Sequence, residues 1–247
     1  MDPIVTPGLV LREIKYKEAD RILTLLTPQL GVISAAAKGS LRLKNKLFSA
    51  CGLFCYSDFR LYPGKNMYTV DEASVKNVFH GLSDSIENMG LAMYLAELAQ
   101  MFSPSGEEAG VVLRLLLNSL YLISEKKTPL WQVKAVYELR LCSECGFLPQ
   151  LLLCKGCGLY DGKSFYLDLQ EGTIWCEDCA ARMGKRPNLD PGALYAVRHI
   201  CLAEDKKAFS FRISAASGRQ LAQTAERYAL LRAGGTPKSY AFLKTLM

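Results

Sequence analysis

Histidine is scarce in this sequence: the 247 residues contain only two, His80 and His199. Neither lies in an arrangement with cysteine or aspartate that would support the nucleophilic or acid–base catalysis in which histidine commonly serves. A phosphate-binding loop is also missing, because the glycine-rich segment 234–239 lacks the Gly-x4-Gly-Lys-Ser/Thr spacing. We therefore expect no catalytic residues and no enzymatic activity.

Long hydrophobic runs are missing too. The most apolar stretch, residues 111–123, is too short to cross a bilayer and is interrupted by Arg114 and Asn118. The first residues show neither the basic nor the apolar region of a secretory signal. Nine cysteines, an odd number, without such a signal fit a reducing compartment. We expect a globular, cytoplasmic protein with no membrane partner.

Four of the cysteines form two Cys-x-x-Cys pairs, Cys154/Cys157 and Cys176/Cys179. The segment between them has the pattern of a short hairpin, with strands at 165–169 and 173–175 around a Gln-Glu-Gly turn. Such a hairpin would bring both pairs to one point, and the spacing is that of a zinc site. Since four thiolates complete a tetrahedron and leave no position for water, the predicted Zn²⁺ is structural.

Disulfides or a redox-active pair are the alternatives for these four cysteines, and the paired spacing favours metal over both. A third pair, Cys142 and Cys145, lies on a predicted helix at i and i+3. We interpret it as core packing, although it could instead offer alternative metal ligands. Cys51, Cys55 and Cys201 are also interpreted as core residues.

Charge is divided unevenly along the chain, whose formal net charge is +6. Residues 1–80 carry eleven Lys and Arg against seven Asp and Glu, and residues 181–247 carry twelve against four. The middle of the chain is acidic. Basic surfaces attract phosphate backbones through counterion release, but many basic proteins bind no nucleic acid. Charge alone does not decide between the two.

The N-terminal 80 residues have the pattern of a small β-barrel. Strands are predicted at 9–16, 21–26, 32–38, 47–62 and 67–75, separated by Gly, Pro and Asn turn signals. Five strands of this length favour an OB-fold, with an SH3-like barrel as the alternative.

From residue 83 onward the apolar period becomes helical. Helices are expected up to residue 102, at 111–124, from an N-cap at Thr128 to residue 146, at 191–204 and at 217–231. The predicted class is α+β: an OB-fold domain at 1–80, a helical domain at 81–150 and 187–247, and an inserted zinc module at 151–186.

Candidate DNA contacts cluster in the predicted barrel. A loop between two strands is rich in cations and has little acid nearby, and further cations lie on the preceding strands. A solvated turn is the ordinary alternative. The predicted contacts are Arg12, Lys15, Arg21, Lys38, Arg42, Lys44 and Lys46. A second, C-terminal basic patch consists of Arg212, Arg219, Arg227 and Arg232.

Several segments resemble the bacterial RecO family of DNA repair proteins. They include Val5 to Arg12, the run Glu18 to Thr27, and Ala37-Lys38-Gly39-Ser40. The segment Leu91 to Leu98 and the stretch from Tyr137 through Pro149 to Cys154-x-x-Cys157-Gly158 are similar as well. The resemblance covers nearly the whole chain.

This resemblance implies an N-terminal OB-fold, a helical domain and a zinc-finger module. It also implies a recombination mediator that binds single- and double-stranded DNA, anneals complementary strands and associates with the nucleoid. The implied partners are RecR, single-strand-binding protein and, indirectly, RecA. The residues also allow a zinc-containing adaptor, in which the helices bind protein partners and DNA contact is secondary. A zinc-dependent enzyme would need an open metal position, which four thiolates do not provide.

Overall fold

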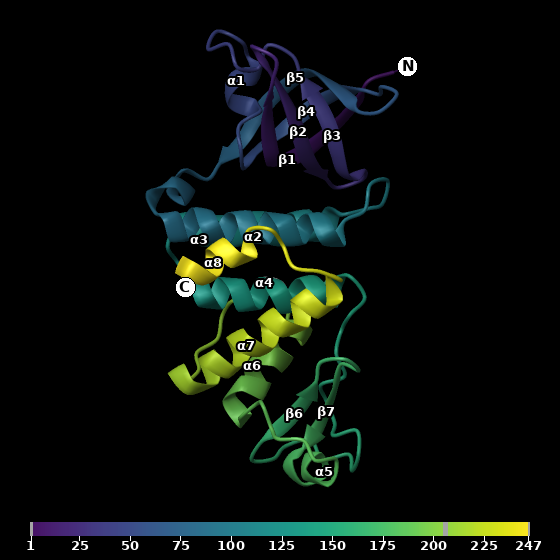
Figure 1. The fold of residues 1–247 in the computed structure, drawn as a ribbon, viewed down its shortest axis with the longest axis vertical. Coiled ribbons are helices and arrows are strands. Elements are labelled where there is room, and N and C mark those ends of the chain that lie inside the picture. Colours follow the sequence, from purple (N-terminus) through teal and green to yellow (C-terminus); the bar gives the residue numbers. More distant parts are fainter. Residues whose placement is uncertain (1, 205–206, 247) are drawn as a thin grey trace. The chain divides into compact units, whose positions relative to one another are not determined.

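The computed structural model describes residues 2–204 and 207–246, which divide into two compact units. One unit consists of residues up to 125 together with 238–246, and the other consists of residues 126–237. Figure 1 shows the β-barrel of the first unit and the helices and small hairpin of the second. Each unit is described separately below.

The first unit begins with a closed five-stranded barrel. Its strands are β1 (Ile4–Tyr16), β2 (Asp20–Thr27), β3 (Gly31–Ala37), β4 (Cys55–Tyr62) and β5 (Tyr68–Val78), in the order β1-β2-β3-β5-β4. The first half of β1 pairs with β4 and its second half pairs with β2, which closes the barrel. A helix between the third and fourth strands completes the OB-fold.

Alternating residues fill the barrel. Leu23 and Leu25, Ile33 and Ala35, and Phe59 all lie in one buried cluster, as expected when every second side chain of a strand points inward. Leu47 and Cys51 of the connecting segment join the same cluster. The predicted α+β class with an N-terminal OB-fold is confirmed.

The predicted strand at 47–62 is wrong in its first half. Helix α1 (Leu47–Ala50) occupies it, and β4 begins only at Cys55. Leu47, Ala50 and Cys51 are buried at i, i+3 and i+4, which is helical spacing. Phe54 has a positive φ of 58° and reverses the chain into β4. The alternation seen in the sequence therefore starts later than predicted.

Three helices complete the first unit: α2 (Ile86–Phe102), α3 (Gly110–Ser124) and α8 (Tyr240–Leu246), after the short 3-10 turn η1 (His80–Asp84). The Ser85 side chain caps α2 by accepting a hydrogen bond from the Asn88 amide. The α2–α3 loop covers one end of the barrel, where the Gly106 amide donates to the Leu30 carbonyl. Gly31 allows this approach, since a Cβ there would lie 2.1 Å from the Pro104 oxygen.

Helix α8 returns the C-terminal segment to the first unit. It packs on α2, and both the amide and the hydroxyl of Ser239 donate hydrogen bonds to Glu97, over 2.9 and 2.8 Å. Gly90 of α2 lies beneath Leu246, where a Cβ would come within 2.8 Å of a leucine methyl.

The second unit contains four helices and a hairpin. They are α4 (Leu130–Glu144), β6 (Phe165–Asp168), β7 (Thr173–Cys176), α5 (Glu177–Arg182), α6 (Pro191–Leu202) and α7 (Ala215–Arg232). Helices α4, α6 and α7 pack on one another. The N-cap of α4 is Pro129 rather than the predicted Thr128, because Pro129 still has extended ψ and the helix starts one residue later. Asp190 caps α6 with a hydrogen bond of 2.7 Å from the Ala193 amide.

Candidate metal centre and basic barrel end

The hairpin brings the two Cys-x-x-Cys pairs together as predicted. Cys154 and Cys157 lie in a tight turn, closed by a hydrogen bond from the Gly158 amide to the Cys154 carbonyl. Cys176 ends β7, and Cys179 lies on α5. The Lys155 amide donates to the Ile174 carbonyl, which fixes the turn to β7. Two separate local structures thus present their sulfur atoms to one point.

The four sulfur atoms fit a single tetrahedral metal ion. All of them lie within 4.8 Å of one another, and the Sγ atoms of Cys157 and Cys176 are 3.6 Å apart. A Zn²⁺ ion with Zn–S bonds of about 2.3 Å requires sulfur atoms about 3.8 Å apart. Gly156 is required by this packing, because a Cβ there would lie 2.9 Å from the Cys179 sulfur. The cluster is therefore compatible with a zinc site.

Hydrogen-bond donors around the cluster stabilise negative sulfur. The Cys176 amide donates to the Sγ of Cys154 over 3.2 Å, and the Arg182 guanidinium donates to the Sγ of Cys179 over 3.0 Å. Burial raises the pKa of Cys154, but hydrogen bonds from the amides of Cys176, Cys157 and Gly156 lower it by more. The net result is a pKa of about 6, below the ordinary value for a thiol. Four thiolates at these distances repel one another, and a bound cation relieves that repulsion.

Arginines hold the hairpin and the preceding loop to the helices. The Arg232 guanidinium, on α7, donates to the carbonyls of Leu169 and Gln170 over 3.0 and 2.9 Å. Arg198, on α6, donates to the carbonyls of Leu151, Leu152 and Tyr160 over 2.8, 3.0 and 2.7 Å. Both side chains are used inside the second unit. Arg232 therefore does not belong to a free C-terminal patch.

The remaining cysteines lie outside the cluster among the described residues. Cys51, Cys55, Cys142 and Cys201 are buried, which confirms their interpretation as core residues. Burial raises the pKa of Cys51 to about 12 and that of Cys201 to about 11. Cys145 is only half-buried, because it follows the last residue of α4.

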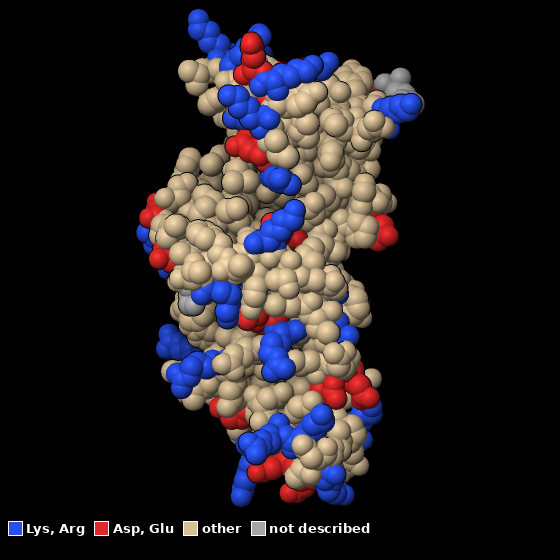
Figure 2. Space-filling model, in the orientation of Figure 1, with Lys and Arg blue, Asp and Glu red and all other residues tan. Residues whose placement is uncertain are grey.

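Most of the predicted DNA-binding residues gather at one end of the barrel, whereas Arg12 lies opposite Thr24 in the middle of β2. Lys15 pairs with Arg21 in the β1–β2 ladder, and Arg21 pairs with Ala37, the residue before Lys38. The loop 38–46 is tied to the β1–β2 turn by hydrogen bonds from the Leu41 amide to the Ala19 carbonyl and from the Gly39 amide to the Asp20 carboxylate. Figure 2 shows Lys and Arg side chains gathered at the upper, barrel end of the view.

Six of these cations have no side-chain interaction partner among the described residues. Their side chains are exposed, and within residues 2–204 and 207–246 none of them forms an ion pair or a side-chain hydrogen bond. They are Arg12, Lys15, Lys38, Arg42, Lys44 and Lys46. By contrast, Arg60 and Lys76 on β4 and β5 are paired with Glu72 and Asp58, over 3.8 and 3.2 Å. Unpaired, solvated cations keep their full charge available to a ligand.

Arg21 is the exception among the predicted contacts. Its side chain is largely buried, forms an ion pair of 2.9 Å with Glu13 and donates to the Phe48 carbonyl over 2.9 Å. The guanidinium also stacks 5.4 Å from the centre of the Phe48 ring. Arg21 therefore fastens β2 to β1 and to α1. Lys17, in the β1–β2 turn, is a further exposed cation close to Lys15 that is not among the predicted contacts.

A groove of 880 Å³ runs beside the basic loop. Lys38 and Lys46 line it from the loop, and Asp71 and Glu72 line it from β5. Its lining also includes Tyr62, which is 40% exposed. Arg60 lines the groove from β4 but is paired with Glu72, so the unpaired cations of this groove lie on its loop side.

No helix in the described part of the chain is both long and apolar enough to span a membrane. The closed five-stranded barrel and the four-cysteine hairpin define the class first: an OB-fold protein with an appended four-cysteine module that is compatible with a metal site.

Comparison with known proteins identifies the family. Residues 1–79 match the model for the Recombination protein O N terminal, and residues 83–241 match that for the Recombination protein O C terminal. The chain belongs to the RecO family of DNA repair proteins. This is a family of DNA repair mediators and not a known enzyme family.

Relatives named DNA repair protein RecO are similar to this chain over most or nearly all of their length. The chain is 31% identical to that of Acetivibrio thermocellus over 246 residues, covering 100% of this chain and 98% of the relative. It is 28% identical to that of Symbiobacterium thermophilum, covering 97% and 96%. With that of Alkaliphilus metalliredigens the identity is 34% over 176 residues, covering 71% and 72%.

Proposed function

We propose that this protein is a non-enzymatic recombination mediator that binds single- and double-stranded DNA and anneals complementary strands. In the cell it would act with RecR on DNA coated by single-strand-binding protein and help to load RecA, in the cytoplasm and at the nucleoid. Membership in the RecO family supports this role. The observation that carries it is the set of six exposed, unpaired cations on an OB barrel, five of which gather at one end of it.

Annealing requires two phosphate backbones to approach each other, and their mutual repulsion opposes this. Lysine and arginine side chains that neutralise phosphates release condensed counterions, and the release drives binding without sequence preference. A protein that holds one strand in this way lowers the repulsion felt by the second. The proposed contacts are Arg12, Lys15, Lys38, Arg42, Lys44 and Lys46. Arg21 has a positioning role, since it holds the strands that carry them.

The metal site has a structural role in this proposal. Cys154, Cys157, Cys176 and Cys179 would bind one Zn²⁺ ion, and four thiolates leave no open position for a substrate or for water. Residues 1–80 would be the DNA-binding domain, 81–150 and 187–247 a helical domain, and 151–186 the zinc module. Zinc would stabilise that module without touching DNA.

Titration of the full-length protein with fluorescent single-stranded DNA at several salt concentrations tests the proposal. The affinity should fall linearly with salt on logarithmic axes, with a slope of roughly −0.7 for each neutralised phosphate. The double variant Arg42→Glu/Lys44→Glu should bind at least tenfold more weakly at low salt and show a slope about 1.4 units shallower.

Lys76→Glu is the matched control, because Lys76 is an exposed barrel cation already paired with Asp58. It should change both slope and affinity much less than the loop variant. An affinity that does not depend on salt, or an equal loss in both variants, would contradict the proposal. Absent DNA binding with retained binding of protein partners would favour the adaptor function instead.

A further inference from the structure

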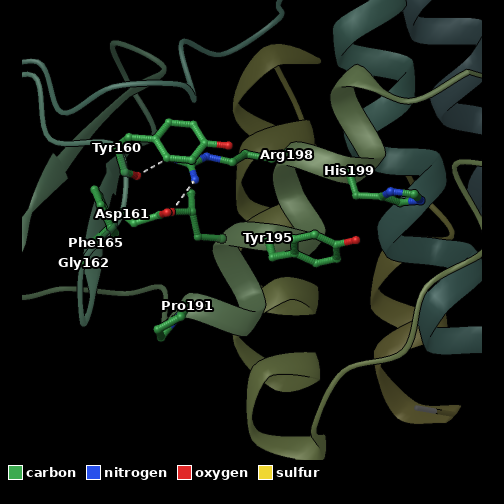
Figure 3. Close-up of a pocket in the computed structure, with 9 residues that line it drawn as sticks. Tyr160, Asp161, Gly162, Phe165, Pro191, Tyr195, Arg198 and His199 are labelled. Atoms are coloured by element: carbon green, nitrogen blue, oxygen red, sulfur yellow. Dashed lines mark hydrogen bonds and ion pairs between the residues drawn. The ribbon is translucent and has the colours of Figure 1, made fainter.

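A pocket of 420 Å³ lies in the second unit between α6 and the loop that precedes β6. Its volume is within the range of about 300–1,000 Å³ typical of sites for small ligands. Figure 3 shows its residues, which come from two segments far apart in the sequence. Its lining includes Tyr160, Phe165, Pro191, Tyr195, Arg198 and His199. The proposed mediator role gives this pocket no task.

One side of the pocket presents aromatic rings from α6. Tyr195 is 61% exposed, and its ring lies nearly parallel to that of His199, with centroids 6.1 Å apart and an interplanar angle of 20°. The edge of His199 in turn meets Phe211, with centroids 5.9 Å apart. A contact of 2.8 Å between the His199 Nε2 atom and the Lys207 carbonyl fixes the imidazole. The packed rings hold Tyr195 in place while most of its surface faces solvent.

The other side of the pocket is rigid. The Arg198 guanidinium lies 4.3 Å from the centre of the Tyr160 ring and also donates to the Tyr160 carbonyl. Figure 3 shows Arg198 extending from α6 to this ring and to Asp161. The same guanidinium also donates to the Leu151 and Leu152 carbonyls, so Arg198 orders the wall. A preorganised wall lowers the entropic cost of binding a planar group.

Three unpaired cations lie close in the chain to residues that line the pocket or contact its lining. Lys163 follows the lining residue Gly162, and Arg212 follows Phe211. Arg219 lies two residues after Ser217, whose hydroxyl donates to Asp190, the N-cap of α6. All three cations are exposed, and in the described ranges none has an ion-pair partner. Asp161 is the acid in the lining, and its side chain is 82% exposed and 3.5 Å from Arg198.

We propose that this pocket receives an unstacked base of single-stranded DNA, with the neighbouring phosphates held by Lys163, Arg212 and Arg219. Exposed aromatic rings beside cations are the pattern that binds single strands, because every base has a π-face and every nucleotide a charge. The surrounding positive charge favours a polynucleotide over an apolar peptide. The inference rests on the proposed DNA-binding function and adds a second contact surface, separate from the residues of the barrel.

Comparing the affinities of the full-length protein for oligo-dT and for an abasic oligonucleotide of equal length tests the inference. Loss of a stacked base costs about fivefold in affinity or more. Tyr195→Ala should therefore weaken binding to oligo-dT at least about fivefold and change binding to the abasic strand little. Tyr195→Phe retains the ring and should bind both strands as the unmodified protein does.

Tyr121→Ala is the matched control, since Tyr121 is an exposed tyrosine on α3 of the other unit. It should leave both affinities unchanged. A second measurement is photo-crosslinking to oligonucleotides that contain 5-iodouracil, followed by mass spectrometry. Crosslinks to Tyr160, Tyr195 or His199 would support the pocket, whereas crosslinks found in the barrel alone would overturn it.

The two proposals fail in different ways. If Tyr195→Ala loses no preference for oligo-dT while Arg42→Glu/Lys44→Glu loses affinity, the pocket inference is wrong and the mediator function stands. If the unmodified protein binds neither strand at low salt, the mediator function fails and the pocket inference falls with it. If Tyr195→Ala instead abolishes binding of an apolar peptide and leaves the affinity for DNA unchanged, the pocket is a protein-binding site and the inference is wrong.

Discussion

The barrel and the four-cysteine hairpin use the same kinds of cation for opposite purposes. Arg42 and Lys44 of the barrel are exposed and unpaired. Around the hairpin, Arg182 donates to a cysteine sulfur, while Arg198 and Arg232 donate to backbone carbonyls. The first arrangement leaves charge for a ligand, and the second spends it on holding a small structure together. Counting charges along a sequence does not separate the two.

The two regions use their cations differently because their hydrophobic cores differ in size. The barrel encloses a cluster of eleven buried residues, so it can leave its surface cations free. Each hairpin strand has only four residues, so the hairpin strands contribute just four buried hydrophobic side chains, those of Phe165, Leu167, Ile174 and Cys176. A two-stranded hairpin alone is at best marginally stable in water. The hairpin therefore depends on its sulfur cluster and on the arginines that hold it.

The largest expected effect is a change that unfolds the hairpin region and leaves the barrel folded. Cys176→Ser/Cys179→Ser removes half of the proposed metal ligands, and binding of structural zinc contributes about 10–16 kcal/mol in zinc-finger peptides. We expect loss of stoichiometric zinc and rapid proteolytic cleavage within residues 151–186. Metal analysis and limited proteolysis measure both.

The barrel serves as the internal control in that experiment. Its strands should stay resistant to protease, and the salt dependence of DNA binding should persist. Loss of protection in the barrel would show that the two regions do not fold independently.

A smaller effect is expected at the contact between α7 and the hairpin turn. Arg232→Leu removes the hydrogen bonds to the Leu169 and Gln170 carbonyls, and one hydrogen bond to a charged group contributes about 1.5–3 kcal/mol. Hydrogen exchange of the β6 and β7 amides should accelerate at least tenfold. Arg227→Leu, on the same helix but exposed and unpaired, should leave exchange unchanged. Equal acceleration in the two variants would mean that Arg232 acts only through the stability of α7.

The last prediction concerns thiol reactivity and leaves the fold of both regions unchanged. Because burial raises the pKa of Cys51 to about 12, it should react with iodoacetamide at pH 8 about a thousandfold more slowly than a free thiol. Exposed Cys157 should react once a chelator has removed metal. Mass spectrometry of time points measures both rates, and fast labelling of Cys51 in folded protein would show that its burial is transient.

The same raised pKa determines the direction in which the contribution of Cys51 to folding stability changes with pH. The folded state keeps the Cys51 proton above the ordinary thiol pKa of 9.0, whereas the unfolded state loses it. The unfolded state then binds fewer protons, so this contribution to stability falls as pH rises from about 9 toward 12. It is fully present below pH 9.

Short-range signals predicted much of this architecture. The spacing of Cys154, Cys157, Cys176 and Cys179 located the metal cluster, since two tight turns and a hairpin determine its geometry locally. Alternation located the strands of the barrel. Alternation failed at 47–54. The structure there is determined by the burial of Leu47 and Cys51 against the strands of the barrel, which are long-range contacts.

Roles that depend on tertiary environment could not be predicted. Arg21 and Arg42 look alike in the sequence, yet only the fold buries Arg21 against Phe48. The pocket is similar, since Tyr160 and Tyr195 lie 35 positions apart without a motif. Their proximity follows from the packing of α6 against the loop before β6.

The return of α8 to α2 has a consequence for synthesis of the protein. Residues 126–237 are inserted between the two segments of the first unit, so Ser239 and Leu246 reach α2 only after the whole inserted segment has been synthesised. The barrel can fold early on the ribosome, but the α2 surface around Glu97 and Gly90 stays uncovered until residues 238–246 have been made. The first unit is therefore completed only after the chain of the second unit has been synthesised.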